Sequence, residues 1–338
     1  MALTIVGEPL PNMPWQDKPA GHNGVLWRDT RNPIVRWNPT PSTARIFNSA
    51  CVPWEDGFIG VFRADHRDIY PHLHVGRSKD GIAWEFDDNE IDLRDEDGKP
   101  YISRYSYDPR VVKIDDTYYV TWCTDFGGPA LGLARTTDFK KFTRMENICT
   151  PYNRNGVLFP RKIDGDYVLL TRPSDAGHTA FGDIFLSRSK DLIHWGRHRR
   201  VMTAGPVWWE ATKIGAGAPP IETSEGWLLF YHGVQNTCNG YVYSFGAVLL
   251  DLEQPEKVLY RTRNYLHTPE LDYETNGFVP NVTFPCAALH DPQTGRIAVY
   301  YGSADTYIAV VYGYIPELIE HIKKDSELIP GDAESWRG

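Results

Sequence analysis

Ser187-Arg-Ser-Lys-Asp-Leu-Ile-His-Trp195 is the third copy of a nine-residue pattern that decides the fold. The earlier copies are Gly76-Arg-Ser-Lys-Asp-Gly-Ile-Ala-Trp84 and Ala134-Arg-Thr-Thr-Asp-Phe-Lys-Lys-Phe142, and a fourth has decayed to Ala247-Val-Leu-Leu-Asp251. Each complete copy contains an arginine, a turn around an aspartate, and an aromatic residue that opens the next strand. A β-sandwich would not repeat such a turn, whereas the blades of a propeller do.

A second repeat indicates the number of blades. Short strands that follow a turn and begin with an aromatic or apolar residue recur five times, at Asp56–Arg63, Asp116–Trp122, Gly165–Arg172, Gly226–His232 and Gly295–Gly302. Their leading positions, 58, 118, 167, 227 and 297, are separated by 60, 49, 60 and 70 residues. The sequence therefore predicts an all-β fold, a five-bladed β-propeller in which these strands line the axis.

The two ends of the chain differ from this pattern. Residues 1–40 are rich in proline and predict an irregular N-terminal arm packed on the propeller, which we expect to span residues 41–315. Residues 316–338 are expected to form a C-terminal helix and tail, because Leu318, Ile319 and Ile322 have helical spacing.

Composition limits the possible partners. The chain of 338 residues has a net charge of −9 and no basic block, which argues against nucleic acid and anionic membranes as partners. The five cysteines are scattered without zinc spacing and are interpreted as reduced thiols. We find neither a signal peptide nor an apolar run long enough to cross a bilayer, so we expect a cytoplasmic protein.

One carboxylate has an unusual setting. In Tyr105-Ser-Tyr-Asp108-Pro-Arg110, the proline favours extended backbone at Asp108, and two tyrosine rings flank the carboxyl group. A partly desolvated carboxyl group of this kind is typical of a general acid. The alternative is an ordinary turn in which Asp108 and Arg110 form a surface ion pair.

Polar residues at the ends of the five repeated strands should converge on one axial pocket. These residues are Arg63, Thr124, Asp125, Arg172, His232 and, after Ala304, Asp305. Arg154, Arg172, Lys213 and His232 form a cationic subset that would suit a phosphate, because arginine binds phosphate in a bidentate manner and lysine binds it as a point charge. The alternative is that these cations pair with carboxylates such as Asp175 and Glu210.

The sequence favours neither a metal nor an organic cofactor. Asp65-His66 and His72-Leu-His74 place imidazoles near carboxylates, but no third ligand is spaced to complete a site, so we expect no metal. Lys213-Ile-Gly-Ala-Gly217 lacks the spacing of a nucleotide-binding loop, and no serine lies in a nucleophile-elbow motif.

Seven ordered motifs resemble those of the β-mannoside phosphorylases of glycoside hydrolase family 130. They are Arg45-Ile-Phe-Asn-Ser-Ala50, Val61-Phe-Arg-Ala-Asp-His66, Tyr107-Asp-Pro-Arg110, Arg154-Asn-Gly-Val-Leu-Phe-Pro-Arg161, Lys213-Ile-Gly-Ala-Gly217, Tyr231-His-Gly233 and Tyr301-Gly-Ser-Ala-Asp305. The resemblance runs from about residue 14 to 320 and is strongest to the subgroup that acts on β-1,4-mannosides, either mannosyl-N-acetylglucosamine or manno-oligosaccharides.

The resemblance implies a reversible, inverting phosphorolysis that gives α-mannose 1-phosphate and a shortened acceptor. It makes Asp108 the general acid, whose proton passes through the 3-hydroxyl of the scissile mannosyl unit. Inorganic phosphate is then a co-substrate, and the resemblance implies that Arg154, Arg172, Lys213, His232 and Tyr243 bind it. The residues implied to bind the mannoside are Asn48, Ser49, Arg63, Asp305, Tyr107, His178 and Phe284. Because family members often form homo-oligomers, we also expect one here.

Three other functions stay open at this point. A few loop residues could change the preferred linkage to β-1,2. A hydrolase on the same propeller would need Asp65, Asp125 or Glu210 as a base to activate water. The third possibility is a propeller that binds carbohydrate without catalysis.

Overall fold

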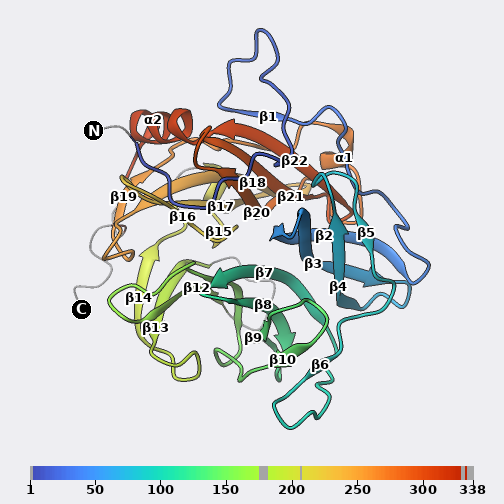
Figure 1. Cartoon of the computed structure of the whole chain (residues 1–338). Helices are drawn as coiled ribbons and strands as arrows, with labels where there is room; N and C mark the ends of the chain where they lie inside the picture. The colour runs from blue at the N-terminus through green and yellow to red at the C-terminus, as the bar shows by residue number, and fades with distance from the viewer. Residues whose placement is uncertain (1–2, 175–181, 206–207, 329–331, 333–338) are drawn as a thin grey trace.

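Five sheets, antiparallel except for one strand at the edge of a blade, are arranged in a ring around a central axis (Figure 1). The structure is a computed structural model, and it describes residues 3–174, 182–205, 208–328 and 332. The arrangement confirms the predicted five-bladed β-propeller. Each blade has four strands in order from the axis outward, and two blades carry one additional strand.

The strands are grouped here by their place in the blade, from blade one to blade five. The innermost strands are β2 (Thr43–Trp54), β7 (Ser106–Ile114), β11 (Asn153–Leu158), β15 (Lys213–Ala216) and β20 (Thr283–Asp291). The second strands are β3 (Gly57–His66), β8 (Thr117–Asp125), β12 (Tyr167–Pro173), β17 (Gly226–Thr237) and β21 (Arg296–Ser303). The third strands are β4 (Pro71–Ser78), β9 (Pro129–Thr136), β13 (Ile184–Ser189), β18 (Gly240–Leu250) and β22 (Tyr307–Tyr314).

The fourth strands are β5 (Glu85–Phe86), β10 (Phe142–Arg144), β14 (Gly196–Met202), β19 (Val258–Arg261) and β1 (Leu26–Arg28). The two additional strands are β6 (Leu93–Arg94), which runs parallel to β10, and β16 (Ile221–Thr223), which pairs with β17. The structure also contains α1 (Asp272–Thr275), α2 (Ile315–Asp325) and a short 3-10 turn, η1 (Trp208–Glu210).

The N-terminal arm closes the ring. Its residues Leu26–Arg28 form β1, which pairs antiparallel with β22 and so completes blade five with the opposite end of the chain. The expectation that this arm is irregular was therefore wrong for these three residues. A three-residue strand carries too little periodicity to be recognised without its partner.

The five repeated strands are the second strands of the blades, not the innermost ones, so the prediction that they line the axis was wrong. The other repeat is the turn after the third strand. In its first copy, Oδ1 of Asp80 accepts the backbone N–H groups of Ile82 and Ala83 at 2.8 Å each. Asp138 and Asp191 make the equivalent pairs of bonds in blades two and three. This capping of the turn is the physical reason that the aspartate recurs.

The core lies between the blades. Each of the five junctions between neighbouring sheets encloses a hydrophobic cluster; between blades one and two, for example, Val61 and Val75 pack with Val120 and Trp122. The predicted C-terminal helix is confirmed as α2, which buries Leu318, Ile319 and Ile322 against the outside of the ring.

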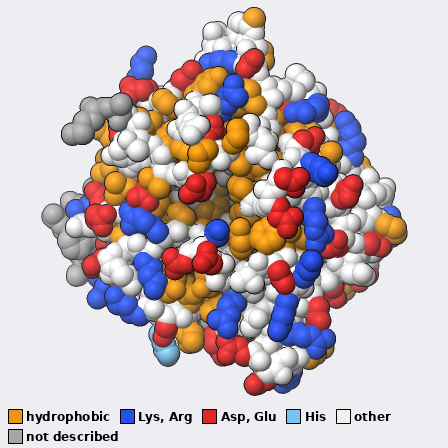
Figure 2. Space-filling model, in the orientation of Figure 1, with side chains coloured by type: hydrophobic (Ala, Val, Ile, Leu, Met, Phe, Trp, Pro, Cys, Tyr) orange, Lys and Arg blue, Asp and Glu red, His pale blue; other side chains and the backbone are white. Residues whose placement is uncertain are grey.

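One face of the molecule shows Lys and Arg side chains interspersed with Asp and Glu around a central hollow (Figure 2). This face therefore has no extended basic patch of the kind that binds nucleic acid. Within the described part of the chain, we find no helix that is both long and apolar enough to cross a membrane.

Candidate active site

Three polar residues point into the axis because the innermost strands bulge at the same place. Asn48 in β2, Asp108 in β7 and Asn155 in β11 each interrupt the pairing with the second strand. Their φ angles are 49°, 51° and 54°, in the left-handed region that Asn and Asp tolerate better than most residues. Bulges re-aim side chains and are common beside active sites. The backbone thus presents one polar side chain from each of three neighbouring blades.

These side chains line an axial cavity of about 290 Å³. The cavity is polar on most sides and contains carboxylates, amides and cations from all five blades. Its lining residues are Asn48, Arg63, Tyr107, Asp108, Arg154, Asn155, Arg172, Lys213, Tyr243, Val279, Val282, Phe284 and Asp305.

Asp108 is held by two donors. Its Oδ1 accepts hydrogen bonds from Nδ2 of Asn48 at 2.7 Å and from Nη1 of Arg63 at 3.3 Å. Arg63 is itself fixed, because its Nε donates to Asp65, and Asp65 also pairs with Arg45. The position of the Asp108 carboxylate is therefore set by a chain of charged contacts that begins outside the cavity.

Asp305 is a second carboxylate on the same side of the cavity. It lies in the turn between β21 and β22 with φ of 45°. Burial raises the pKa of Asp305 to about 6; Arg63 partly offsets this effect, and the charge of Asp108 adds to it. Asp305 is thus able to accept hydrogen bonds from a sugar near neutral pH, while its protonated form gains population below pH 6.

Arg110 does not pair with the carboxylate of Asp108, so the surface ion pair considered above was wrong. Its side chain is buried and donates to the backbone carbonyls of Asp108, Pro109, Ala216 and Gly217. Arg110 therefore links β7 to the end of β15 and to the residue that follows it.

Three of the cations come from the other side of the ring. Asp108, Asn48, Arg63 and Asp305 belong to blades one, two and five, whereas Arg154, Arg172 and Lys213 belong to blades three and four. Tyr243 of β18 lies with the cations of blades three and four. The cavity therefore has an acidic sector and a cationic sector.

No carboxylate from the described residues neutralises the three cations. Arg154 donates to Oγ of Ser174 at 3.0 Å and to Oη of Tyr107 at 3.4 Å. Lys213 lies over the rings of Tyr241 and Tyr243, with its Nζ 4.7 Å and 5.5 Å from their centroids. Asp175, considered above as a partner, lies outside the described residues. Among the residues described, the arrangement leaves positive charge available for an anion.

The local electrostatics favour the binding of an anion. Burial, together with the charges of Arg172 and Arg154, lowers the pKa of Lys213 to about 8. Burial also lowers the pKa of Arg172, and the nearby Arg154 adds to this effect. Burial raises the pKa of Tyr243 to about 12, so its hydroxyl group stays protonated and able to donate a hydrogen bond. A bound dianion would offset the repulsion between the cations.

His232 lies behind the cationic sector. Its ring is fully buried and does not line the cavity, and its Nε2 is 3.1 Å from Nη1 of Arg172. Burial and the charges of Arg172 and Arg110 lower the pKa of His232 well below its usual value. The ring is thus neutral, and Nε2 accepts a hydrogen bond from Arg172.

The other predicted site residues divide into three groups. Tyr107 and Phe284 line the cavity, whereas Ser49 is buried in β2 and does not. His178 lies outside the described residues. Asn155, Val279 and Val282 line the cavity but were not predicted. The only sequence signal for Asn155 was a polar residue, Asn, directly before the apolar part of an innermost strand.

None of the three bases considered for a hydrolase lines the cavity. Asp65 is paired with Arg45 and Arg63. Glu210 is buried against Arg261 and Tyr231 rather than against the cavity cations. Oδ1 of Asp125 accepts the backbone N–H of Gly128 in the turn between β8 and β9.

Known proteins are similar to this chain in sequence and in fold. The family model glycoside hydrolase 130, described as β-1,4-mannooligosaccharide phosphorylase, matches residues 8–324. A β-1,4-mannooligosaccharide phosphorylase of Ruminococcus albus is 51% identical over 332 residues, which cover 96% of this chain and 98% of the relative. A 1,2-β-oligomannan phosphorylase of a Thermoanaerobacter species is 36% identical, covering 79% of this chain and 89% of the relative.

Solved structures agree with the fold. A β-1,2-mannobiose phosphorylase from Listeria innocua, solved with β-1,2-mannobiose, has a TM-score of 0.76 at 27% identity and covers 88% of this chain and 99% of its own. A mannose phosphorylase from Leishmania mexicana, solved with a phosphate ion, has a TM-score of 0.60 at 13% identity, covering 85% and 87% of the two chains. The second likeness extends to the fold alone.

Proposed function

Because the chain belongs to glycoside hydrolase family 130, we propose that its axial cavity carries out the inverting phosphorolysis of β-1,4-linked mannosides by inorganic phosphate. The substrate class is mannosyl-N-acetylglucosamine or manno-oligosaccharides. The products are α-mannose 1-phosphate and the shortened acceptor, and the reaction is reversible. The enzyme is thus a phosphorylase of the glycosyltransferase type, and phosphate serves as its co-substrate without a further cofactor.

The observation that carries this proposal is the division of the cavity into two sectors. Asp108 would supply the proton in the acidic sector, through the 3-hydroxyl of the mannosyl unit, to the oxygen of the departing acceptor. The bond between C1 and that oxygen then breaks, and the oxygen keeps the electron pair and takes up the proton. A phosphate oxygen held by Arg154, Arg172 and Lys213 would attack C1 from the opposite face, which inverts the configuration.

A phosphate nucleophile explains why the cationic sector needs no base. An inverting hydrolase places a carboxylate about 6.5–9.5 Å from the acid to activate water. Here the second cavity carboxylate, Asp305, is grouped with Asp108 and Arg63 rather than with the cations. We assign Asn48, Arg63 and Asp305 to the mannosyl unit. This arrangement favours transfer to phosphate over transfer to water.

His232 would act on phosphate through Arg172. A neutral imidazole that accepts from Nη1 fixes one side of the guanidinium and leaves the other donors for the anion. We therefore treat His232 as a positioning residue, and Tyr243 as a direct donor to phosphate. Tyr107 and Phe284 would line the sugar-binding side of the cavity.

The reaction is tested by incubating the enzyme with β-1,4-mannobiose, mannosyl-β-1,4-N-acetylglucosamine or β-1,2-mannobiose, each with and without phosphate. Proton NMR should detect α-mannose 1-phosphate only when phosphate is present, and fastest from a β-1,4 substrate. Free mannose at an equal rate without phosphate would establish a hydrolase instead. Faster turnover of the β-1,2 disaccharide would reverse the assigned linkage.

Two further proposals concern the state of the protein in the cell. We propose a homo-oligomer, which light scattering on the purified protein would test. We also propose a cytoplasmic location, because all five cysteines are free and three of them are buried. Fractionation of the source cells would test it, and recovery outside the cytoplasm would refute it.

A further inference from the structure

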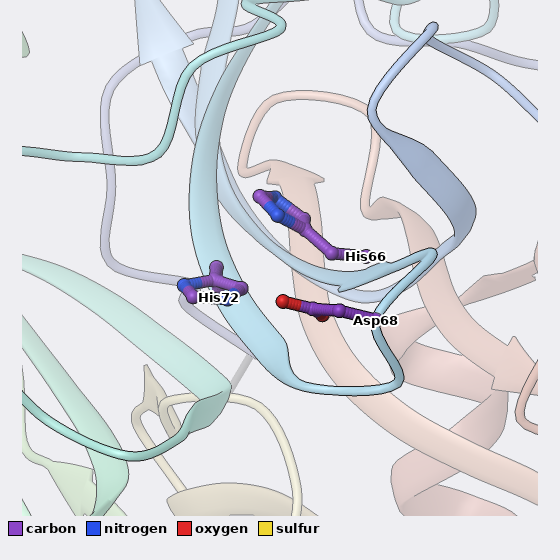
Figure 3. Close-up of side chains that lie close together, drawn as sticks. All are labelled: His66, Asp68 and His72. Carbon is purple, nitrogen blue, oxygen red and sulfur yellow. The ribbon is translucent and has the colours of Figure 1, made fainter.

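A second cluster of polar side chains lies outside the catalytic cavity, on the hairpin between β3 and β4. His66 ends β3, Asp68 lies in the turn, and His72 is in β4 (Figure 3). One ligand atom from each of the three side chains lies within 4.8 Å of the other two. His66 is three residues beyond Arg63 along β3, or about 10 Å. None of the three side chains belongs to the lining of the cavity.

The hydrogen bonds of the two rings leave one bare nitrogen on each. His74 is fully buried, and its Nδ1 donates to the backbone oxygen of Asp87 at 2.7 Å, so its Nε2 must be an acceptor. Nε2 of His66 is 2.7 Å from that acceptor and therefore donates to it. The unprotonated nitrogen of neutral His66 is then Nδ1.

His72 is oriented in the same way by a carboxylate. Its Nδ1 is 2.5 Å from Oε2 of Glu90, so it donates there and keeps Nε2 as the bare nitrogen. Metal-binding histidines usually donate their second nitrogen to a carboxylate, a carbonyl group or another acceptor. Both His66 and His72 have such a partner before any ion is present.

The third group is held by the turn. Oδ1 of Asp68 accepts the backbone N–H of Tyr70 at 3.0 Å, and the N–H of Ile69 donates to the carbonyl of His66. These bonds keep the carboxylate beside the two rings. Two imidazole nitrogens and a carboxylate oxygen each offer a lone pair. A cation bound between them would stabilise this arrangement.

We propose that His66, Asp68 and His72 bind a divalent transition metal ion of the zinc type. Zinc accepts imidazole nitrogen and carboxylate oxygen at about 2.0–2.2 Å, and three protein ligands leave one position for water. Tetrahedral geometry at these bond lengths separates the ligand atoms by about 3.3 Å. Small rotations of the half-buried rings and of the exposed carboxylate would bring them to this spacing. The spacing of the histidines in the sequence showed no third ligand, and Asp68 supplies it.

The test is a zinc titration of the full chain without a histidine tag, after treatment with a chelator, followed by calorimetry and by the melting temperature. We expect one equivalent of Zn²⁺ to bind and to raise the melting temperature. Asp68→Asn keeps the acceptor for Tyr70 but removes the charge, and His72→Gln removes a ring. Glu90→Gln, which removes the partner of His72, should weaken zinc binding by about 10–100-fold. Asp68→Asn and His72→Gln should each weaken it by at least as much.

His194→Ala is the matched control, because His194 is another surface histidine bonded to an aspartate, Asp191, at 2.8 Å. This variant should bind zinc as tightly as the unchanged protein. The proposal is overturned if no equivalent of zinc binds, if binding survives unchanged in both Asp68→Asn and His72→Gln, or if His194→Ala loses it. Circular dichroism of each variant confirms that a loss of binding is not a loss of fold.

Discussion

The side-chain amide of Asn48 donates a 2.7 Å hydrogen bond to Oδ1 of Asp108, and both residues hold left-handed backbone at bulges of neighbouring innermost strands. Arg63 donates to the same oxygen. Both side-chain contacts that the described residues make with Asp108 therefore use Oδ1, and Oδ2 is the oxygen left to donate a proton to a substrate hydroxyl. The carboxylate is positioned before substrate binds, as preorganised catalysis requires.

Replacement of Asp108 by Asn should abolish most turnover without changing the fold. The amide keeps an oxygen that Asn48 and Arg63 can contact, but it cannot donate an acidic proton. General acid catalysis contributes about 10²–10⁴-fold, so kcat on β-1,4-mannobiose should fall by that factor. Phosphate binding measured by calorimetry should stay within about twofold of the wild-type value.

A second substrate separates the loss of an acid from a loss of structure. An aryl β-mannoside with a good leaving group needs less protonation, so its phosphorolysis by Asp108→Asn should fall much less than that of mannobiose. Equal losses on both substrates, or wild-type turnover of mannobiose, would contradict the role of Asp108 as the acid.

We expect the turn after β4 to contribute to the free energy of unfolding through Asp80. Asp80→Ala removes the acceptor for the N–H groups of Ile82 and Ala83, and each hydrogen bond contributes about 0.5–1.5 kcal/mol. Because the turn is exposed, we expect the free energy of unfolding to fall by about 1 kcal/mol. Urea denaturation monitored by fluorescence measures this change. Asp80→Asn keeps Oδ1 and should lose less.

The same turn predicts a dependence on pH. Burial disfavours the charge of Asp80, but the backbone hydrogen bonds from Ala83 and Ile82 outweigh it and lower its pKa below the ordinary value. Its charged form therefore stabilises the fold above the pKa of the unfolded chain, near 3.9, and this stabilisation disappears as the pH falls through the lower pKa of the folded state. The stability difference between wild type and Asp80→Asn should shrink below about pH 4. A difference that grows on acidification would contradict this assignment.

Sequence reasoning found the charged residues of the cavity but not their geometry. Asp108, Arg63, Arg154 and Lys213 were recognised because charges beside apolar strands are unusual and because they fall within the motifs of a known family. The innermost strands were not distinguished from the second strands, since both are apolar and period two does not encode distance from an axis. Only the pairing of β2 with β3 and of β7 with β8 settles that order.

Features that depend on a bulge or a turn could not be predicted from the sequence either. Asn155 is polar, short and followed by glycine, which equally describes a loop residue, and its direction follows from the shift in pairing between β11 and β12. His66 and His72 were noticed as a pair, but Asp68 joins them only because the hairpin folds back at Tyr70. Neither arrangement has a fixed spacing that a motif could capture.

Phosphate use should decline above about pH 8 because of Lys213. Burial and the neighbouring Arg172 and Arg154 lower the pKa of Lys213 to about 8, so the lysine of the free enzyme is charged below that pH and neutral above it. The value of kcat/KM for phosphate reports the free enzyme and should fall by up to tenfold per pH unit above pH 8. The measurement is initial rates at varied phosphate from pH 6.5 to 9.5.

Lys213→Arg provides the control for this profile. Arginine stays protonated across the range, so the ratio of wild-type to variant kcat/KM should decrease above pH 8, while the titration of phosphate itself cancels in the ratio. Lys213→Gln should raise the KM for phosphate more than that for the mannoside. A ratio that stays constant across the pH range would show that Lys213 does not bind phosphate.

Gly215 in β15 keeps the space in which the cationic sector is assembled. A methyl group at this position would overlap the ring of His232 and lie 2.7 Å from Oδ1 of Asn155. Gly215→Ala should therefore displace His232, and with it Arg172, and raise the KM for phosphate by about tenfold or more with a smaller effect on the KM for mannoside. Gly196→Ala is the matched control, because a methyl group there meets no atom within 4 Å. If the two variants have the same KM for phosphate and similar melting temperatures, His232 does not position Arg172 for the anion. If only Gly215→Ala loses phosphate affinity and its KM for mannoside is preserved, the imidazole acts through the arginine.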